Sequence, residues 1–193
     1  MRSPAAAALA LMAALGVIVC GSHASSPRID VIDLVRAFDE AEKRPPLPAS
    51  EVGHYGRGGV WRAAILAPAP ARLIWTLRLP ARAALRAQLG VRPNGPGEAT
   101  LDFRVGVSDD RIYEALAHTR VASAQDGWTP IVVDLSRYAG RKWSLFYRPD
   151  THPWRLVLSV DAITSAGATA VWGEPVVSTD ADAARTFAAR QRP

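Results

Sequence analysis

Apolar and polar side chains alternate with a period of two along much of the chain from about Gly59 onward. Successive side chains of a β-strand point to opposite faces, so such strands bury one face and expose the other. The expected strands cover residues 73–79, 85–91, 101–107, 131–135, 142–148, 154–160 and 170–177. Turn signals rich in Gly, Pro, Asn and Asp separate them, for example at 93–97 and 126–127. Short strands without intervening helices predict a mostly β, antiparallel sandwich or barrel.

The residues before the strands show a helical spacing of apolar side chains instead of a period of two. Ser26 suits a helix cap and Pro27 the first helical position. Apolar residues then recur with helical spacing at Val31, Leu34, Val35 and Phe38. The pattern predicts one short amphipathic helix within residues 25–44, through which the chain could dock on a partner. A proline-rich linker at 45–51, the sandwich at 52–177 and a flexible tail at 178–193 are expected to follow.

The first 24 residues have the layout of a signal peptide. Arg2 precedes an apolar run over residues 5–19, which is shorter than the ~20 residues a membrane-spanning helix needs. Small residues at Ser22 and Ala24 fit cleavage before Ser25. The expectation is an exported protein, periplasmic or extracellular.

The single cysteine offers an alternative anchoring. Residues 17–20, Val-Ile-Val-Cys, resemble a lipoprotein box with Cys20 as the acylated residue, although Val19 stands where a small residue is expected. Contact with a membrane is therefore expected only if Cys20 is lipidated. Cleavage before Ser25 would leave a chain without cysteine, which excludes disulfides and thiol chemistry.

The charge pattern does not favour nucleic acid as a partner. Lys and Arg number 23 against 18 Asp and Glu, a formal net charge of +5. The arginines are dispersed along alternating strands, whereas nucleic-acid binding requires a clustered basic patch.

No spacing typical of a catalytic or zinc site occurs. Apart from His23 in the leader, the histidines His54, His118 and His152 lie far apart, and no paired His or His-Glu motif is present. A Gly-x-Ser-x-Gly elbow, a phosphate loop and a dinucleotide fingerprint are likewise missing from the sequence. The sequence predicts a protein that is not an enzyme.

One segment combines the side chains suited to an oriented polar ligand. Arg148, Asp150, His152 and Trp154 lie together between two prolines. An indole face suits the C–H side of a sugar ring, and Arg and Asp can bond hydroxyls bidentately. These four residues form the candidate ligand-binding loop. The alternative is an ordinary hairpin loop that packs its aromatic residues inward.

An ordered set of motifs in the second half carries a family resemblance. Residues 127–130 (Gly-Trp-Thr-Pro) lead into Val-Val-Asp-Leu-Ser at 132–136, Tyr-Ala-Gly follows at 138–140, and Trp-Gly-Glu-Pro closes the set at 172–175. Together with Arg62–Ile65 and Leu79-Pro80 upstream, the set resembles the galactose-binding-like jelly-roll domains of bacterial exported proteins, which stand alone or accompany sulfatase-like and glycan-processing proteins. The resemblance implies a two-sheet antiparallel jelly-roll sandwich. Independently of the resemblance, Trp128 and Trp172 are expected to close opposite ends of the sandwich core.

The same resemblance suggests one metal site, for a structural Ca²⁺. Such domains often carry a structural Ca²⁺, and hard oxygen ligands suit this ion. Asp161 and Glu174 flank the last predicted hairpin and are the candidate ligands. Each carboxylate could instead pair with an arginine. No other cofactor is expected.

These observations favour an exported, non-catalytic module that recognises a carbohydrate or another cell-envelope component. The alternative is an accessory subunit that docks on an envelope protein. An enzyme acting on envelope polysaccharide is a third reading, and it would require carboxylates that converge in a cleft.

Overall fold

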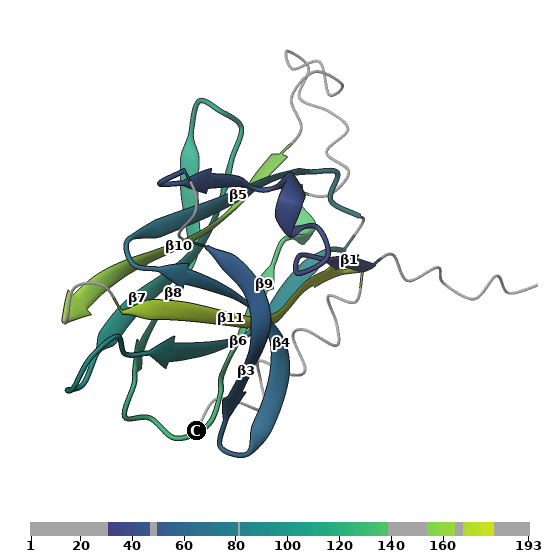
Figure 1. Ribbon diagram of the computed structural model, residues 1–193. Coiled ribbons are helices and arrows are strands. Elements are labelled where there is room, and N and C mark those ends of the chain that lie inside the picture. Colours follow the sequence, from purple (N-terminus) through teal and green to yellow (C-terminus); the bar gives the residue numbers. More distant parts are fainter. Residues whose placement is uncertain (1–30, 47–49, 81, 139–153, 165–167, 180–193) are drawn as a thin grey trace, which may run out of the picture.

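Two antiparallel β-sheets stacked face to face make up the protein (Figure 1). The computed structural model describes residues 31–46, 50–80, 82–138, 154–164 and 168–179. Within these residues, helix is limited to the short 3-10 turns η1 (Phe38–Glu40) and η2 (Ser136–Tyr138). The predicted mostly β sandwich is therefore confirmed.

The first sheet, here called sheet 1, has six strands. They are β1 (Val31–Asp33), β3 (Glu51–Arg57), β4 (Val60–Pro68), β6 (Ala84–Arg92), β9 (Thr129–Asp134) and β11 (Thr169–Ser178). Their spatial order is β3-β4-β11-β6-β9, and β1 pairs with the last residues of β11. Neighbours in space that are far apart in sequence join the two halves of the chain into one sheet.

The second sheet, sheet 2, has five strands. They are β2 (Glu42–Arg44), β5 (Ala71–Leu77), β7 (Thr100–Ser108), β8 (Tyr113–Ala122) and β10 (Trp154–Thr164), in the spatial order β2-β5-β10-β7-β8. β10 is the central strand, paired with β5 on one side and with β7 on the other.

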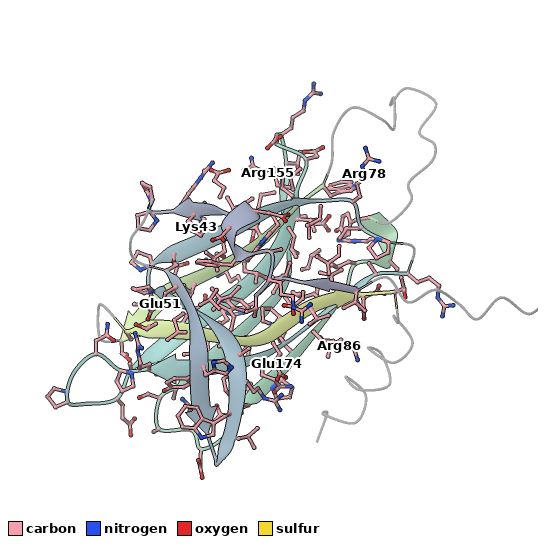
Figure 2. All side chains as sticks on the ribbon, turned by 45° about the vertical axis from the view of Figure 1, so that its right-hand side comes forward. Lys43, Glu51, Arg78, Arg86, Arg155 and Glu174 are labelled. Atoms are coloured by element: carbon pink, nitrogen blue, oxygen red, sulfur yellow. The ribbon has the colours of Figure 1, made fainter. Side chains whose placement is uncertain are left out.

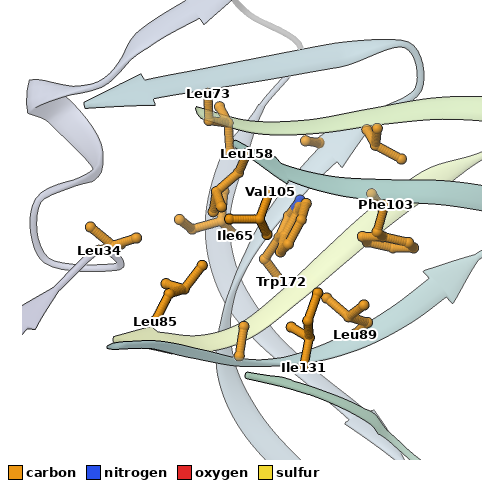
Figure 3. Close-up of a cluster of buried hydrophobic side chains, with 14 of the residues drawn as sticks. Leu34, Ile65, Leu73, Leu85, Leu89, Phe103, Val105, Ile131, Leu158 and Trp172 are labelled. Atoms are coloured by element: carbon orange, nitrogen blue, oxygen red, sulfur yellow. The ribbon is translucent and has the colours of Figure 1, made fainter. Parts of the chain in front are cut away.

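The alternating side chains meet between the sheets in one hydrophobic core (Figure 3). Leu73, Trp75 and Leu77 of β5 point inward and are buried, as the period of two predicts. Trp172 of β11 meets Phe103 of β7 edge to face, with ring centroids 5.0 Å apart. Aromatic residues from both sheets thus pack directly against each other at this point.

The predicted amphipathic helix is wrong for residues 31–44. These residues form β1, a turn, η1 and β2. β1 extends sheet 1 by pairing with Val176–Ser178, and the Asp33 side chain accepts a hydrogen bond from the amide of Val35 at 2.9 Å. The pairing of β1 with β11 and this local side-chain hydrogen bond stabilise the observed structure more than the weak helical propensity of the segment would stabilise a helix.

Without that helix, the docking surface expected on it does not form. Leu34 is fully buried, and its amide donates to the carbonyl of Pro175 at 3.0 Å. The Trp75 indole N–H donates to the carbonyl of Ala37 at 2.8 Å and fixes the following turn. Residues 31–41 are therefore part of the sandwich. The start of the predicted helix, the strand at 142–148 and most of the tail lie outside the described residues.

The outer face of sheet 1 is covered by an aromatic side chain. Trp128 lies on Gly90 and Gly173, where a Cβ atom would approach the indole to 3.5 Å and 2.7 Å. Tyr55 meets Trp128 edge to face with centroids 6.1 Å apart. The expectation that Trp128 closes an end of the core is therefore wrong. Trp128 packs on the outside of the sheet because two glycines leave room for its ring.

Candidate functional site

A groove lies across the outer face of sheet 2. Its volume is about 410 Å³, and strands β2, β5, β7, β8 and β10 all contribute to its lining. Ile74 of β5 with Val157 and Ser159 of β10 form a floor that is less than one tenth exposed. These residues alternate with the inward-facing core residues, so the groove belongs to the opposite face of the same strands.

Tyr113 forms one wall of the groove. Its ring occupies the space over Gly106, where a Cβ atom would lie only 2.5 Å from the ring atom Cε2. A glycine on the outward side of β7 therefore lets the ring lie against the sheet backbone. The Tyr113 residue stays 49% exposed. The groove thus presents a supported aromatic surface to solvent.

Arg155 connects two sides of the groove. Its guanidinium contacts Asp110 in the β7–β8 turn and Glu42 on β2. The hydrogen bond with Asp110 raises the pKa of Arg155 above its usual value. The side chain is 22% exposed, so packing and two ion pairs fix its orientation. Glu42 also contacts Arg44, and that hydrogen bond lowers the pKa of Glu42.

A second ion-pair group lies along the same face. Arg104 contacts Asp102, which is buried, and Asp161 at 3.0 Å. The hydrogen bond with Asp102 raises the pKa of Arg104. His118 of β8 contacts the same Asp102 carboxylate. Arg72, exposed on β5, has no ion-pair partner within the part of the chain that the structure describes.

This arrangement is suited to binding a polar ligand. Guanidinium groups and carboxylates offer donors and acceptors in fixed positions beside an aromatic ring, which suits hydroxyl groups on a ring with apolar faces.

The structure describes only one residue of the predicted ligand loop. Trp154 begins β10 and is partly buried, with its ring edge to face against Tyr138 at 5.0 Å. Arg148, Asp150 and His152 lie outside the described residues. The next residue after Trp154 is Arg155, which lines the groove, so the predicted loop leads directly into a strand of this site.

The two candidate calcium ligands are not brought together. Asp161 lies on β10 in sheet 2 and contacts Arg104 at 3.0 Å. Glu174 lies on β11 in sheet 1 and contacts Arg62. Each carboxylate therefore pairs with an arginine, which is the predicted alternative to binding Ca²⁺. Within residues 31–179, gaps excepted, no three His, Cys, Asp or Glu side chains gather in a way that could hold a metal ion.

Sequence reasoning missed Tyr113, Arg72 and Arg44 as site residues. One signal was present: Gly106 takes an outward position of an alternating strand whose other outward residues include Asp102 and Arg104. An isolated glycine within a strand marks a bulge or a close approach. The register of β7 and β8 shifts at this point, between Val105 and Gly106, and no sequence pattern predicts which residue then lies over the glycine.

None of the helical segments that the structure describes has the length and apolar character needed to span a membrane.

Solved structures share this fold at low sequence identity. The CBM51-2 and INT domains of ZmpB from Clostridium perfringens align over 77% of this chain and 31% of theirs, with 11% identity and a TM-score of 0.53. The CBM51 from Clostridium perfringens GH95, in complex with methyl-galactose, aligns over 77% of this chain and 99% of its own, with 12% identity and a TM-score of 0.53.

A further structure contains CBM51-2 of ZmpB in complex with GlcNAc, with 10% identity, a TM-score of 0.52, and coverage of 77% of this chain and 31% of the other. This chain therefore spans about a third of the ZmpB chains and nearly all of the isolated module. No family model and no curated protein matches the sequence. The fold is that of CBM51 modules, which confirms the predicted resemblance to galactose-binding-like jelly-roll domains at the level of architecture.

Proposed function

We propose that the protein is a non-catalytic carbohydrate-binding module that holds a glycan in the groove on sheet 2. The observation that carries the proposal is the Tyr113 ring supported on Gly106, beside arginine and carboxylate side chains in fixed ion pairs. An aromatic face binds the apolar side of a pyranose, while the charged groups bond its hydroxyls. A groove of about 410 Å³ lies within the range of small-ligand sites.

The shared fold supports a hexose-containing glycan as the ligand. The modules that align over this chain are described in complex with methyl-galactose and with GlcNAc. The groove offers both charges: Arg44, Arg72 and Arg155 as donors and Asp110 as an acceptor. The ligand class is therefore a hydroxyl-rich saccharide. A structural Ca²⁺ at Asp161 or Glu174 is not required by this mode of binding.

Replacing Tyr113 by alanine is expected to weaken glycan binding about tenfold, because one aromatic contact contributes about 1 to 1.5 kcal/mol. Tyr113→Phe retains the ring and is expected to bind nearly as the parent does. Ile112→Ala is the matched control, since Ile112 is 69% exposed beside Tyr113 but does not line the groove. The measurement is a glycan array followed by titration calorimetry with the best saccharide. Equal affinities for the parent and Tyr113→Ala would exclude the groove as the site.

We also propose that the chain is exported and cut before Ser25. Expression in a bacterium with an intact secretion system is expected to give a product of residues 25–193, and intact mass spectrometry of the envelope and culture fractions measures it. A product that begins at Cys20 and carries acyl chains would show a lipoprotein instead. A product that retains residues 1–24 would contradict both forms of processing.

A further inference from the structure

Trp61 is the most exposed of the large apolar side chains that the structure describes, at 72%. It lies on β4 next to the β3–β4 turn, far along the hairpin from the main core. Indoles are rarely left this open, because burying one removes a large apolar area from water. Its exposure therefore points to contact with something outside the chain.

The Trp61 ring is supported from one side only. Gly56 faces Trp61 across the hairpin, and a Cβ atom on Gly56 would lie 2.8 Å and 2.9 Å from indole atoms Cε2 and Cδ2. The ring thus lies against the bare backbone of Gly56. The packing explains why a glycine is needed there, but it occupies only one face of the indole. The second face is open to solvent.

The hairpin that carries Trp61 is held in place by contacts from its other side. Arg57 donates to the carbonyls of Val91 and Gly127, both at 2.8 Å. The indole N–H of Trp128 donates to the carbonyl of Val60 at 2.9 Å. Because the strand is anchored on both sides of the turn, the open face of Trp61 is presented without a large ordering cost on binding.

The neighbours of Trp61 make the surface amphipathic. His54 lies two residues before Gly56 on β3, and the alternation of the strand places it on the same side of the hairpin as Trp61. His54 is exposed, and its imidazole offers a donor and an acceptor. A flat apolar ring with one adjacent polar side chain suits a sugar ring, which has apolar C–H faces and a polar edge. A protein partner would need a wider buried area.

We infer that Trp61, supported by Gly56 and flanked by His54, is a second carbohydrate-contact surface that stacks on a pyranose ring of a polysaccharide. It lies on the edge hairpin of sheet 1, whereas the groove lies on the outer face of sheet 2. In Figure 1 the β3–β4 hairpin projects well away from β10 and β5. The inference goes beyond the proposed function, because it gives the module two separate contacts and hence higher avidity for long chains than for short ones.

NMR of the indole N–H signals tests the surface directly. The Trp61 signal is assigned by its loss in Trp61→Phe, and the folded state of each variant is checked from the dispersion of its amide spectrum. The titrants are methyl-galactose, GlcNAc, chitohexaose and soluble galactan. The Trp61 signal is expected to shift with at least one of them, and to shift equally in Tyr113→Ala. A Trp61 signal that no titrant moves, or that stops moving in Tyr113→Ala, would overturn the inference.

Affinity for the polysaccharide gives the second readout. Trp61→Ala is expected to weaken binding of the active polymer about tenfold, and to leave binding of the matching monosaccharide in the groove unchanged. Val60→Ala is the control, since Val60 is an exposed apolar residue on the opposite side of the same hairpin. Unchanged polymer affinity in Trp61→Ala overturns the inference. Loss on Trp61→Ala with no effect of Tyr113→Ala supports it and refutes the groove instead.

Discussion

Replacing Trp172 by alanine is expected to lower the free energy of unfolding by about 3 to 5 kcal/mol, the usual cost of truncating a buried aromatic residue. Trp172 is fully buried on β11, a central strand of sheet 1, and its ring packs on Phe103 of sheet 2. Figure 3 shows the indole among leucine, isoleucine and valine side chains from both sheets. Alanine would leave a cavity at the contact between the two layers.

Urea denaturation followed by far-ultraviolet circular dichroism measures this loss. Trp172→Phe keeps an aromatic ring and is expected to cost clearly less than alanine, because less volume is vacated. Trp61→Ala is the matched control: the same truncation at a 72% exposed position is expected to cost about 1 kcal/mol or less. Similar losses at positions 172 and 61 would contradict the assignment of Trp172 to the core.

The alternating strands could be predicted because their local pattern and their tertiary environment agree. In β5, β6 and β7 one face packs in the core and the other faces outward, so the period of two survives in the sequence. β8 was missed, because as an edge strand it buries little more than Val121 and shows no clear apolar face. β3 was missed for the same reason: it lies at the edge of sheet 1 and buries only Arg57.

The segment 31–44 shows where a helical period misleads. Its apolar residues are spaced as in a helix, yet Leu34 is buried under the β11 end while Val31 is 56% exposed. The decisive partners lie far along the chain: Trp75 is 38 residues from Ala37, and Val176–Ser178 come more than a hundred residues after the segment. Weak helical propensity cannot compete with the strand pairing and burial that these partners offer.

The candidate site depended on contacts that local sequence does not contain. Sequence reasoning chose Trp154 because aromatic and charged residues are adjacent in the chain there, but the Trp154 ring packs on Tyr138. The groove instead assembles Arg44, Arg104, Tyr113 and Arg155 from four different strands. Only the order of strands in sheet 2 brings them together, and strand order is not encoded in any one motif. Carboxylate and arginine pairing was the part of the chemistry that could be anticipated.

Arg57→Met is expected to lower the free energy of unfolding by about 3 kcal/mol, because hydrogen bonds from a charged donor contribute about 1.5 to 3 kcal/mol each and are not additive. Arg57 is 9% exposed, and its guanidinium donates to the carbonyls of Val91, Ser123, Gln125 and Gly127. It has no carboxylate partner among the described residues. These four bonds join the β3–β4 hairpin to β6 and to the loop that leads to Trp128.

Methionine keeps much of the aliphatic stem of arginine. The change in the free energy of unfolding therefore reflects the lost hydrogen bonds, with less lost packing than an alanine substitution would add. Arg86→Met is the matched control. Arg86 is a half-buried arginine in the same sheet, and among the described residues its side chain makes one hydrogen bond, to the Ser178 hydroxyl at 3.1 Å. Losing this bond is expected to cost about 1 kcal/mol. Hydrogen exchange adds a local readout, since Arg57→Met should raise exchange in residues 51–68 and 123–129 before the core strands β7 and β10. Equal stability of the two variants, or uniform exchange throughout the sandwich, would show that Arg57 does not hold the hairpin in place.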